Sequence, residues 1–246
     1  MDNTKLFSHK SDDYSRFRPS YPQEAIAWLR QRCQGESVVD VGAGTGIFTR
    51  ELPRFFQNVC AVEPNAGMRD EFLRLLPDIT CMLSTGENTS LPASSVDLIT
   101  VAQAFHWLDE EKFKSEAVRI LRPGGKAAII WNSSVKDDFT LARDAVCRKY
   151  CPRFSRGYAG KRTPAEGDIF LRNTYFREVE TVSFSNPFVM DLQAFEGNIR
   201  SRSYALLPDN KEYISFMTEL RTVFDKFSSH GVVTELLETK IDLGRF

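Results

Sequence analysis

Short apolar runs alternate with longer amphipathic runs between residues 22 and 131. Parallel strands joined by crossover helices produce this alternation, because such strands are buried on both faces and the helices on one. The pattern predicts five strands, with the sequences SVVDV, NVCAVE, ITCML, VDLITVAQ and KAAIIW. It also predicts helices over residues 22–34, 48–55, 68–76 and 109–121. We therefore expect an α/β fold built on a doubly wound sheet.

The pattern changes after Trp131. Residues 132–177 are rich in Arg, Phe and Tyr, contain Pro152 and Pro164, and include a helical stretch, DFTLARDAVCRKYC, but no clear strand. This segment is expected to be an inserted cap. A strand near EVETVSFSNPF, a helix over residues 210–228 and a last strand within VVTELLETKIDL are expected to follow.

Composition limits the kinds of partner. The chain has 246 residues, of which 42% are hydrophobic, so it can bury the core of one domain with an insertion. Lys and Arg (32) nearly balance Asp and Glu (33), and no long run carries a single sign. A surface suited to nucleic acid or to an anionic membrane is therefore not expected. We expect a small-molecule partner, and either a monomer or a homodimer.

Cysteine and histidine spacing gives no metal site. The five cysteines form no CxxC pair and the three histidines lie far apart, so reduced thiols and no bound metal are expected. The polar N-terminus lacks the apolar core of a signal peptide, and no apolar run approaches the ~18 residues that span a bilayer. These features favour a cytoplasmic location.

A glycine-rich turn follows the first predicted strand. Asp40 ends the apolar run, and Gly42, Ala43, Gly44, Thr45 and Gly46 come directly after it. Glycines allow a ligand to approach the backbone closely, and the following helix start presents N–H groups. The G-x-G-x-G spacing differs from the G-x-G-x-x-G of dinucleotide enzymes, which weighs against NAD. No Gly-Lys-Ser or Gly-Lys-Thr follows, so a Walker loop is excluded.

A second acid ends the next strand. Glu63 lies seventeen residues after Gly46, where a carboxylate can accept hydrogen bonds from both hydroxyls of a ribose. A nucleoside ligand is therefore expected. The alternative is that Asp40 and Glu63 are merely polar strand ends beside a tight turn.

These segments resemble a known family. VVDVGAGTG, AVEPNAGM, STGENTSLPASSVDLITVAQAFHW and LRPGG stand in the order and spacing of the class I S-adenosylmethionine-dependent methyltransferases. The resemblance is greatest to the small-molecule group of methyltransferase type 11 domains and trans-aconitate methyltransferases, and it covers residues 36–131. The lead-in KLFSHKSDDYSRFRPSYP is also similar to that group.

The resemblance implies a Rossmann-like fold with seven strands, mostly parallel with an antiparallel last strand, helices on both faces and a small helical cap. It implies one domain over residues 1–246. That domain would comprise an N-terminal lid and first helix (1–35), a cofactor-binding core (36–131), a cap insertion (132–177) and C-terminal elements that complete the sheet (178–246).

The resemblance also implies S-adenosylmethionine as cofactor and gives roles to particular residues. Glu63 would hold the ribose, with Pro64 and Met68 beside the sugar and adenine. Glu87, where the family more often has aspartate, would face the adenine amino group, with the amide of Asn88 free for a ring nitrogen. The alternative for Glu87 is a solvated loop acid. The methionine end of the cofactor would lie near Asp40, Gly42, Ala43, Gly44, Gly46 and Gln103.

Three further groups of residues are candidates for the chemistry. His106 and Trp107 follow the fourth strand, where His106 could act as a general base or bind an acceptor carboxylate, or both residues could simply close the pocket. Tyr14 and Arg18 suit a lid that reaches the carboxylate of the cofactor, or an ordinary N-terminal arm. In the C-terminal part, a further group is expected to form a cationic wall of the pocket, with a solvated helix face as the alternative: Arg200, Arg202 and Tyr204.

The sequence therefore predicts methyl transfer from S-adenosylmethionine to a small molecule, such as a carboxylic acid, with release of S-adenosylhomocysteine. Two alternatives from other classes stay open at this point, namely a protein that binds S-adenosylmethionine without turnover and an NAD-dependent oxidoreductase. A nucleic-acid methyltransferase is disfavoured, because AQAF stands where an Asn/Asp-Pro-Pro-Tyr tetrad would follow the fourth strand.

Overall fold

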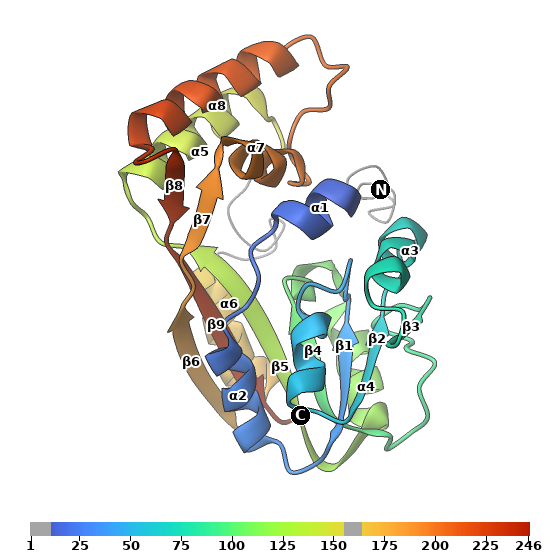
Figure 1. Cartoon of the computed structure of the whole chain (residues 1–246). Helices are drawn as coiled ribbons and strands as arrows, with labels where there is room; N and C mark the ends of the chain where they lie inside the picture. The colour runs from blue at the N-terminus through green and yellow to red at the C-terminus, as the bar shows by residue number, and fades with distance from the viewer. Residues whose placement is uncertain (1–10, 155–163) are drawn as a thin grey trace.

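A seven-stranded sheet carries helices on both faces, and a smaller unit of helices sits beyond one end of the sheet (Figure 1). The computed structural model describes residues 11–154 and 164–246. The strand order is β3-β2-β1-β4-β5-β9-β6, with β9 antiparallel to both of its neighbours. The expected mostly parallel sheet with an antiparallel last strand is confirmed. The strands are β1 (Ser37–Val41), β2 (Asn58–Val62), β3 (Thr80–Met82), β4 (Val96–Ala102), β5 (Leu121–Ser134), β6 (Val179–Ser185) and β9 (Leu237–Gly244).

Alternate residues of the central strands supply two cores. On β1, Val38 packs with Ile26 and Leu29 of α2 (Gln23–Arg32), whereas Val39 and Val41 pack on the side of α4 (Glu110–Ile120). The expected helices correspond to these two and to α3 (Ala66–Leu75). The helix expected after β1 is a short 3-10 helix, η2 (Thr49–Arg54), which contains a proline with no N–H to donate.

The cap is assembled from two parts of the chain that are far apart in sequence. Its helices are α5 (Asp138–Tyr150), α7 (Leu192–Arg200) and α8 (Tyr213–Phe227), and β7 (Phe188–Asp191) pairs with β8 (Val232–Glu235). They share a separate core of buried side chains, among them Cys147, Phe195, Phe216 and Val233. Arg143 on α5 also forms a buried ion pair with Glu235 on β8, with 2.6 Å between Nη1 and Oε1.

Two features of the C-terminal half differ from the sequence-based division. We expected residues 132–177 to form the cap and 178–246 to complete the sheet. Instead α6 (Pro164–Phe170) and the π-helical turn η4 (Leu171–Tyr175) pack against the sheet, where Tyr175 lies 5.2 Å from Phe105 between ring centroids. The strand expected near residues 178–188 is divided into β6 and β7 around Pro187, and the last strand into β8 and β9. The cap therefore recruits residues 188–235, because the apolar face of α5 needs α8 to cover it.

The helix α1 (Ser11–Phe17) lies between the cap and α3, above the sheet (Figure 1). Ser15 Oγ donates to Glu71 of α3 at 2.9 Å, and Arg200 of α7 donates to Asp13 at 2.8 Å. This short helix therefore links the cap to the sheet.

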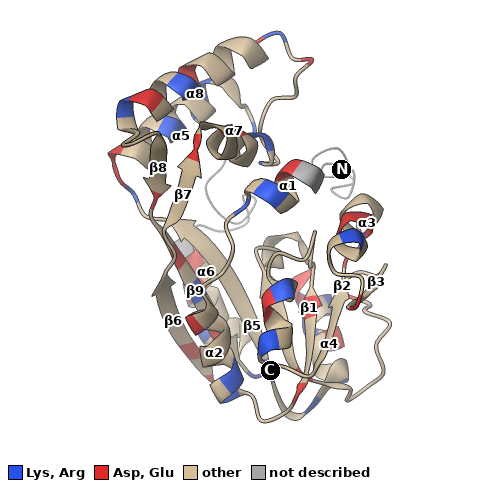
Figure 2. Ribbon diagram, in the orientation of Figure 1, with Lys and Arg blue, Asp and Glu red and all other residues tan. Residues whose placement is uncertain are grey.

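Acidic and basic residues are interspersed over both the cap and the helices of the sheet (Figure 2). Many form ion pairs, such as Arg32 with Glu180 at 2.8 Å. Within residues 11–154 and 164–246, no helix is both long enough and apolar enough to cross a lipid bilayer.

Candidate functional site

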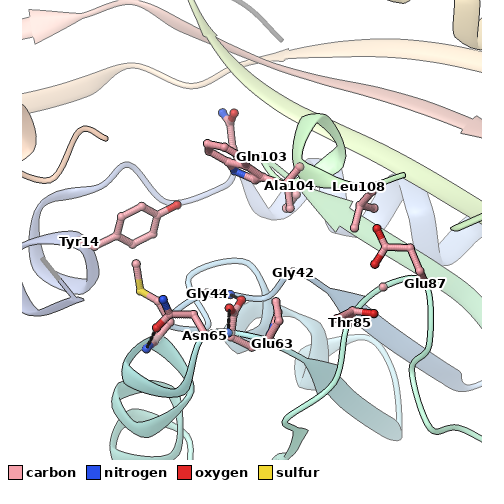
Figure 3. A pocket seen from close by; sticks show the side chains of 15 residues that line it. Tyr14, Gly42, Gly44, Glu63, Asn65, Thr85, Glu87, Gln103, Ala104 and Leu108 are labelled. Atoms are coloured by element: carbon pink, nitrogen blue, oxygen red, sulfur yellow. Dashed lines mark hydrogen bonds between the residues drawn. The ribbon is translucent and has the colours of Figure 1, made fainter. Parts of the chain in front are cut away.

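A cavity of about 270 Å³ opens at the carboxyl ends of β1, β2 and β4 (Figure 3). Ligands bind at this edge in doubly wound sheets. Tyr14 faces the cavity from α1, and the loops after β1 and β2 form the opposite wall. The lining residues are Tyr14, Gly42, Gly44, Glu63, Pro64, Asn65, Met68, Thr85, Gly86, Glu87, Ala102, Gln103, Ala104, Trp107 and Leu108.

The glycines of the turn after β1 serve different purposes. Gly42 has a φ of +69° and approaches Ala104 so closely that an added Cβ would lie 2.6 Å from its Cβ, while Gly44 has a φ of +58° beside the cavity. Gly46 does not line the cavity: an added Cβ would lie 2.5 Å from Leu76 of the α3 end. The structure therefore places Gly46 in the packing of the turn rather than against a ligand.

Glu63 is a buried carboxylate at the cavity wall. Its Oε2 accepts from the N–H of Gly44 and its Oε1 from the N–H of Asn65, each at 2.8 Å. Burial raises the pKa of Glu63, and the two N–H donors oppose that rise. Each carboxylate oxygen has two lone pairs, so both retain capacity for a ligand hydroxyl.

Asp40 lies beside a second, smaller cavity of about 40 Å³ that shares Tyr14, Gly42 and Gln103 with the first. Its carboxyl accepts from the hydroxyls of Thr49 at 2.6 Å and Thr100 at 2.9 Å. Burial raises the pKa of Asp40 to about 7. Ala43, also expected near the cofactor, lines this smaller cavity.

Arg18 is a partly buried cation that lines the smaller cavity, with its Nε fully buried. Its Nη2 donates to the carbonyl of Ser201 at 3.2 Å, and its guanidinium lies 4.8 Å from the ring centroid of Tyr14. Among the described residues, its Nε has no hydrogen-bond partner. Burial, and then the charge of Arg202, lowers the pKa of Arg18 to about 10, so it remains protonated at neutral pH. A partly buried guanidinium with an unused donor is suited to an anion.

The loop after β3 forms the far end of the large cavity. Glu87 lines it, but its Oε1 also accepts from the N–H of Asp109 at the start of α4, at 2.8 Å. Glu87 is thus more than a solvated loop acid. The backbone N–H of Asn88 donates to the carbonyl of Thr85 at 3.2 Å, and Asn88 does not line the cavity. The expectation that this amide is free for a ring nitrogen is wrong, because the tight turn already uses it.

The same loop is fixed to α4 by a buried acid. Glu116 accepts from the N–H of Thr89 at 2.8 Å and from its hydroxyl at 2.5 Å. Arg119 donates to Glu116 and also to the carbonyl of Leu91 at 2.7 Å. The Arg119 hydrogen bond is the main reason that the pKa of Glu116 is lowered to about 2.

Gln103 lines both cavities from the end of β4. It has a φ of +57°, and its Nε2 donates to the carbonyl of Asn132 at 2.8 Å. Pro64 and Met68 also line the large cavity, as does Trp107, whose side chain is partly exposed.

His106 lies outside the residues that line either cavity. Its ring is 4.5 Å from that of Trp107 and 5.5 Å from that of Trp131, between centroids. His106 therefore packs against aromatic rings beside the cavity, and of the two residues expected to close the pocket only Trp107 lines it.

The three candidates near the C-terminus have different positions. Arg200 is paired with Asp13, so it ties α7 to α1 instead of lining a cavity. Arg202 lies near Arg18, and its Nη2 donates to Oδ1 of Asn198 at 2.9 Å. Tyr204 packs edge-on against Phe154, and burial raises its pKa. Arg202 and Tyr204 thus lie with Arg18 where the cap meets the sheet.

Six residues of the large cavity were not predicted from the sequence: Asn65, Thr85, Gly86, Ala102, Ala104 and Leu108. All lie within a few residues of a predicted site residue. Gly86 carries the clearest signal, since an added Cβ would lie 2.8 Å from both Leu108 and Val41. The glycine of the loop GENTSLP could therefore have predicted a position at the cavity where no Cβ fits.

Comparisons with known proteins agree with this geometry. Residues 39–129 match the methyltransferase domain family. An uncharacterized methyltransferase of Mycobacterium bovis is 43% identical over 120 residues, 49% of each chain. An uncharacterized methyltransferase of Schizosaccharomyces pombe is 32% identical over 132 residues, 52% of this chain and 53% of that one. The match therefore spans about half the length of these curated relatives.

Solved structures share the fold over more of the chain. A protein of Anaeromyxobacter dehalogenans, described as a type II methyltransferase, has a TM-score of 0.68 at 24% identity and covers 93% of this chain and 98% of its own. Phosphoethanolamine N-methyltransferase 2 of Haemonchus contortus, solved with S-adenosyl-L-methionine, has a TM-score of 0.53 at 15% identity. The match covers 99% of this chain and 57% of that one. Residues 39–129 therefore match the methyltransferase domain family, and the strand order of the sheet agrees with the fold that the solved methyltransferases share with this chain.

Proposed function

We propose that the protein transfers the methyl group of S-adenosylmethionine to a small-molecule carboxylate and releases S-adenosylhomocysteine. The observation that carries this proposal is the position of Arg18, which lines the smaller cavity and has Arg202 close to it. The adjoining large cavity is lined by Glu63, a carboxylate suited to ribose. A nucleoside site joined to a cationic site suits a nucleoside cofactor and an anionic acceptor.

In this proposal the large cavity holds the nucleoside. Glu63 accepts the ribose hydroxyls with the lone pairs that the N–H groups of Gly44 and Asn65 leave unused. Pro64 and Met68 lie beside the sugar and adenine, and the loop of Gly86 and Glu87 faces the adenine edge, with the second oxygen of Glu87 available for the amino group.

The smaller cavity holds the amino-acid end of the cofactor. The turn of Gly42 and Ala43 supports it, Tyr14 and Gln103 lie between the two cavities, and Arg18 provides a cation for the carboxylate. When bound, S-adenosylmethionine supplies an electrophilic methyl group on a sulfonium.

The acceptor carboxylate is proposed to bind where the cap meets the sheet, near Arg202 and Tyr204. A carboxylate is ionised at neutral pH, so it can form the new C–O bond while the C–S bond breaks, without loss of a proton. The residues of the chain then have to orient the acceptor in line with the methyl group and exclude water. For such an acceptor, Trp107 forms part of the cavity wall and His106 need not be a base.

Two measurements test the proposal. The first is thermal stabilisation by S-adenosylmethionine, S-adenosylhomocysteine or NAD, since a ligand at a hundred times its Kd adds about 2.7 kcal/mol to the free energy of unfolding. The second is release of S-adenosylhomocysteine during a screen of carboxylic acids, phenols and amines. Stabilisation by NAD alone would overturn the cofactor assignment. Binding without turnover would favour a protein that only binds the cofactor, and turnover restricted to phenols or amines would contradict the carboxylate acceptor.

A pair of variants tests the site of the acceptor. Arg202→Gln removes the charge near Arg18 and should raise the KM for an active carboxylic acid by about tenfold or more, since a charged hydrogen bond contributes roughly 1.5–3 kcal/mol. The matched control is Arg221→Gln, which removes an exposed arginine of α8 that pairs with Glu196. Equal effects of the two substitutions on KM would exclude Arg202 from acceptor binding.

A further inference from the structure

The chain between α1 and α2 has no regular structure of its own. Residues 18–22 form neither helix nor strand and include Pro19 and Pro22. In Figure 1 this connection descends from α1 to α2 across the front of the sheet. Backbone carbonyls in such a segment need donors from elsewhere in the fold.

Three asparagine side chains provide those donors. Nδ2 of Asn198 donates to the carbonyl of Phe17 at 2.9 Å. Nδ2 of Asn132 and Nδ2 of Asn186 both donate to the carbonyl of Ser20, at 3.1 and 2.8 Å. The donors come from α7, from β5 and from the connection between β6 and β7. The two carbonyls that accept these hydrogen bonds, those of Phe17 and Ser20, lie on either side of Arg18 in the sequence.

The side-chain amides of Asn132 and Asn186 both form hydrogen bonds with the hydroxyl of Thr239. Oδ1 of Asn132 accepts from Oγ1 of Thr239 at 2.5 Å and from Nδ2 of Asn186 at 3.3 Å. Because Oδ1 is used as an acceptor, Nδ2 of Asn132 is directed to Ser20. The main-chain carbonyl of Asn132 also accepts from Gln103, so the network continues to a residue of both cavities.

We propose that Asn132, Asn186 and Asn198, here called the asparagine clamp, are positioning residues for cofactor binding. The clamp holds residues 17–20 so that the guanidinium of Arg18 lines the smaller cavity near Asp40 before the cofactor arrives. This inference rests on the proposed function, in which Arg18 binds the carboxylate of the cofactor.

Preorganisation is the physical reason for the effect. An irregular segment with its carbonyls unbound samples many backbone conformations, and binding would have to select one of them at the expense of affinity. With the clamp in place, the backbone conformation that binds the cofactor is already fixed when the protein folds. Asn186 and Asn198 line neither cavity, so they act on the dissociation constant through Arg18, whereas Asn132 also lines the smaller cavity itself.

Asn186 gives the sharpest test, because it lines neither cavity. We expect Asn186→Ala to raise the Kd of S-adenosylhomocysteine roughly five- to tenfold in calorimetric titrations, the effect of losing a hydrogen bond of ordinary strength. The matched control is Asn58→Ala, whose amide bonds to Ser37 at the other end of the sheet. The control should leave Kd unchanged.

A double-mutant cycle separates positioning from general destabilisation. Arg18→Ala alone should weaken binding, and adding Asn186→Ala to it should then change Kd by less than twofold. If the asparagine supports only the fold, its effect on Kd will be the same with and without Arg18, which would overturn the proposal. Asn198→Ala, which removes the hydrogen bond to Phe17 at a residue that lines neither cavity, serves as a second variant in the same cycle, with the Tm of each protein measured to confirm folding.

The outcomes distinguish this inference from the proposed function. If the wild-type protein does not bind S-adenosylhomocysteine, the proposed function fails. If the wild-type protein binds and Arg18→Ala binds equally well, the role that the proposed function gives to Arg18 fails, and the clamp fails with it. If Arg18→Ala weakens binding but Asn186→Ala matches Asn58→Ala, the proposed function stands and the clamp is rejected.

Discussion

Asp40 is a single residue whose position alters its chemistry. Its side chain is 1% exposed, and its pKa is raised to about 7, because burial disfavours the charged form more than the hydroxyls of Thr49 and Thr100 favour it. The folded protein therefore binds more protons at Asp40 than the unfolded chain between about pH 4 and 7. The stability that comes from the neutral form is present below about pH 4 and is lost as the pH rises towards 7.

Asp40→Asn should remove this dependence. The free energy of unfolding of the variant, relative to wild type, should increase by up to about 1.4 kcal/mol per pH unit between pH 4 and 7 and then level off. Urea unfolding at pH 5, 6, 7 and 8 measures the difference. Asp138→Asn, at an exposed acid of α5, is the control and should differ from wild type by a constant amount. A constant difference for Asp40→Asn as well would contradict the raised pKa.

His106 gives a second prediction for one residue. Its ring lies 4.5 Å from that of Trp107 and 5.5 Å from that of Trp131, between centroids, and an ionised carboxylate acceptor needs no base. His106→Gln should therefore keep kcat within about threefold of wild type and leave the pH profile of kcat unchanged from pH 6 to 9. Loss of a general base would instead lower kcat roughly 10²- to 10⁴-fold. A fall of that size at constant Tm would restore His106 as the base.

At the scale of elements, the loop after β3 depends on α4 for its position. Glu116 holds Thr89, and Glu87 holds the N–H of Asp109. Glu116→Ala removes the carboxylate that accepts from Thr89 and Arg119 and leaves Arg119 only the carbonyl of Leu91, so it should lower the free energy of unfolding by about 2–3 kcal/mol at pH 7. The Kd of S-adenosylhomocysteine should also rise, because Gly86 and Glu87 lose their support.

The pH dependence of this effect is a separate check. The pKa of Glu116 is lowered to about 2, so its contribution to stability is present above about pH 4.3 and is lost as the pH falls towards 2. The cost of Glu116→Ala, measured by urea unfolding, should therefore be smaller at pH 3 than at pH 7. Glu111→Ala, at an exposed acid of the same helix, should cost little at either pH. An equal cost for the two variants would show that the loop does not depend on Glu116.

The elements around this loop also show what sequence can predict. The sheet from β1 to β5 was predicted because each strand and helix shows its own apolar period within about ten residues. A cap that contains α5 was also predicted, but its second part, residues 188–235, was not, because β7 pairs with β8 some 40 residues away and α5 is covered by α8. The apolar period of a sequence predicts which face of a helix is buried, but it does not predict which other element covers that face.

The same limit applies to the site. The positions of Glu63 and Gly44 could be predicted, since both belong to one strand-turn-strand unit with a fixed register. The turn that uses the amide of Asn88, and the asparagine clamp, arise from contacts between segments far apart in sequence or from a particular turn geometry. Nothing in the residue types alone indicates those contacts.

At the scale of the whole molecule, α1 is the element through which the cap meets the cofactor site. Tyr14 of α1 lines the large cavity, while Asp13 and Phe17 contact α7, a helix that lines neither cavity. An added Cβ at Gly197 of α7 would lie 2.1 Å from the ring of Phe17. A ligand that orders α1 should therefore also slow local opening of α7.

Gly197→Ala tests this coupling. In wild type, saturating S-adenosylhomocysteine should slow amide hydrogen exchange in both α1 and α7. Because an alanine must displace Phe17, the variant should lose about 1–3 kcal/mol of stability, and the ligand should then slow exchange in the loops after β1 and β2 without slowing it in α7. Gln193→Ala, at an exposed position of the same helix, should keep the wild-type response. Unchanged exchange in wild-type α7 on ligand binding would mean that the cap and the cofactor site are energetically independent, and that acceptor and cofactor bind without influencing each other through α1.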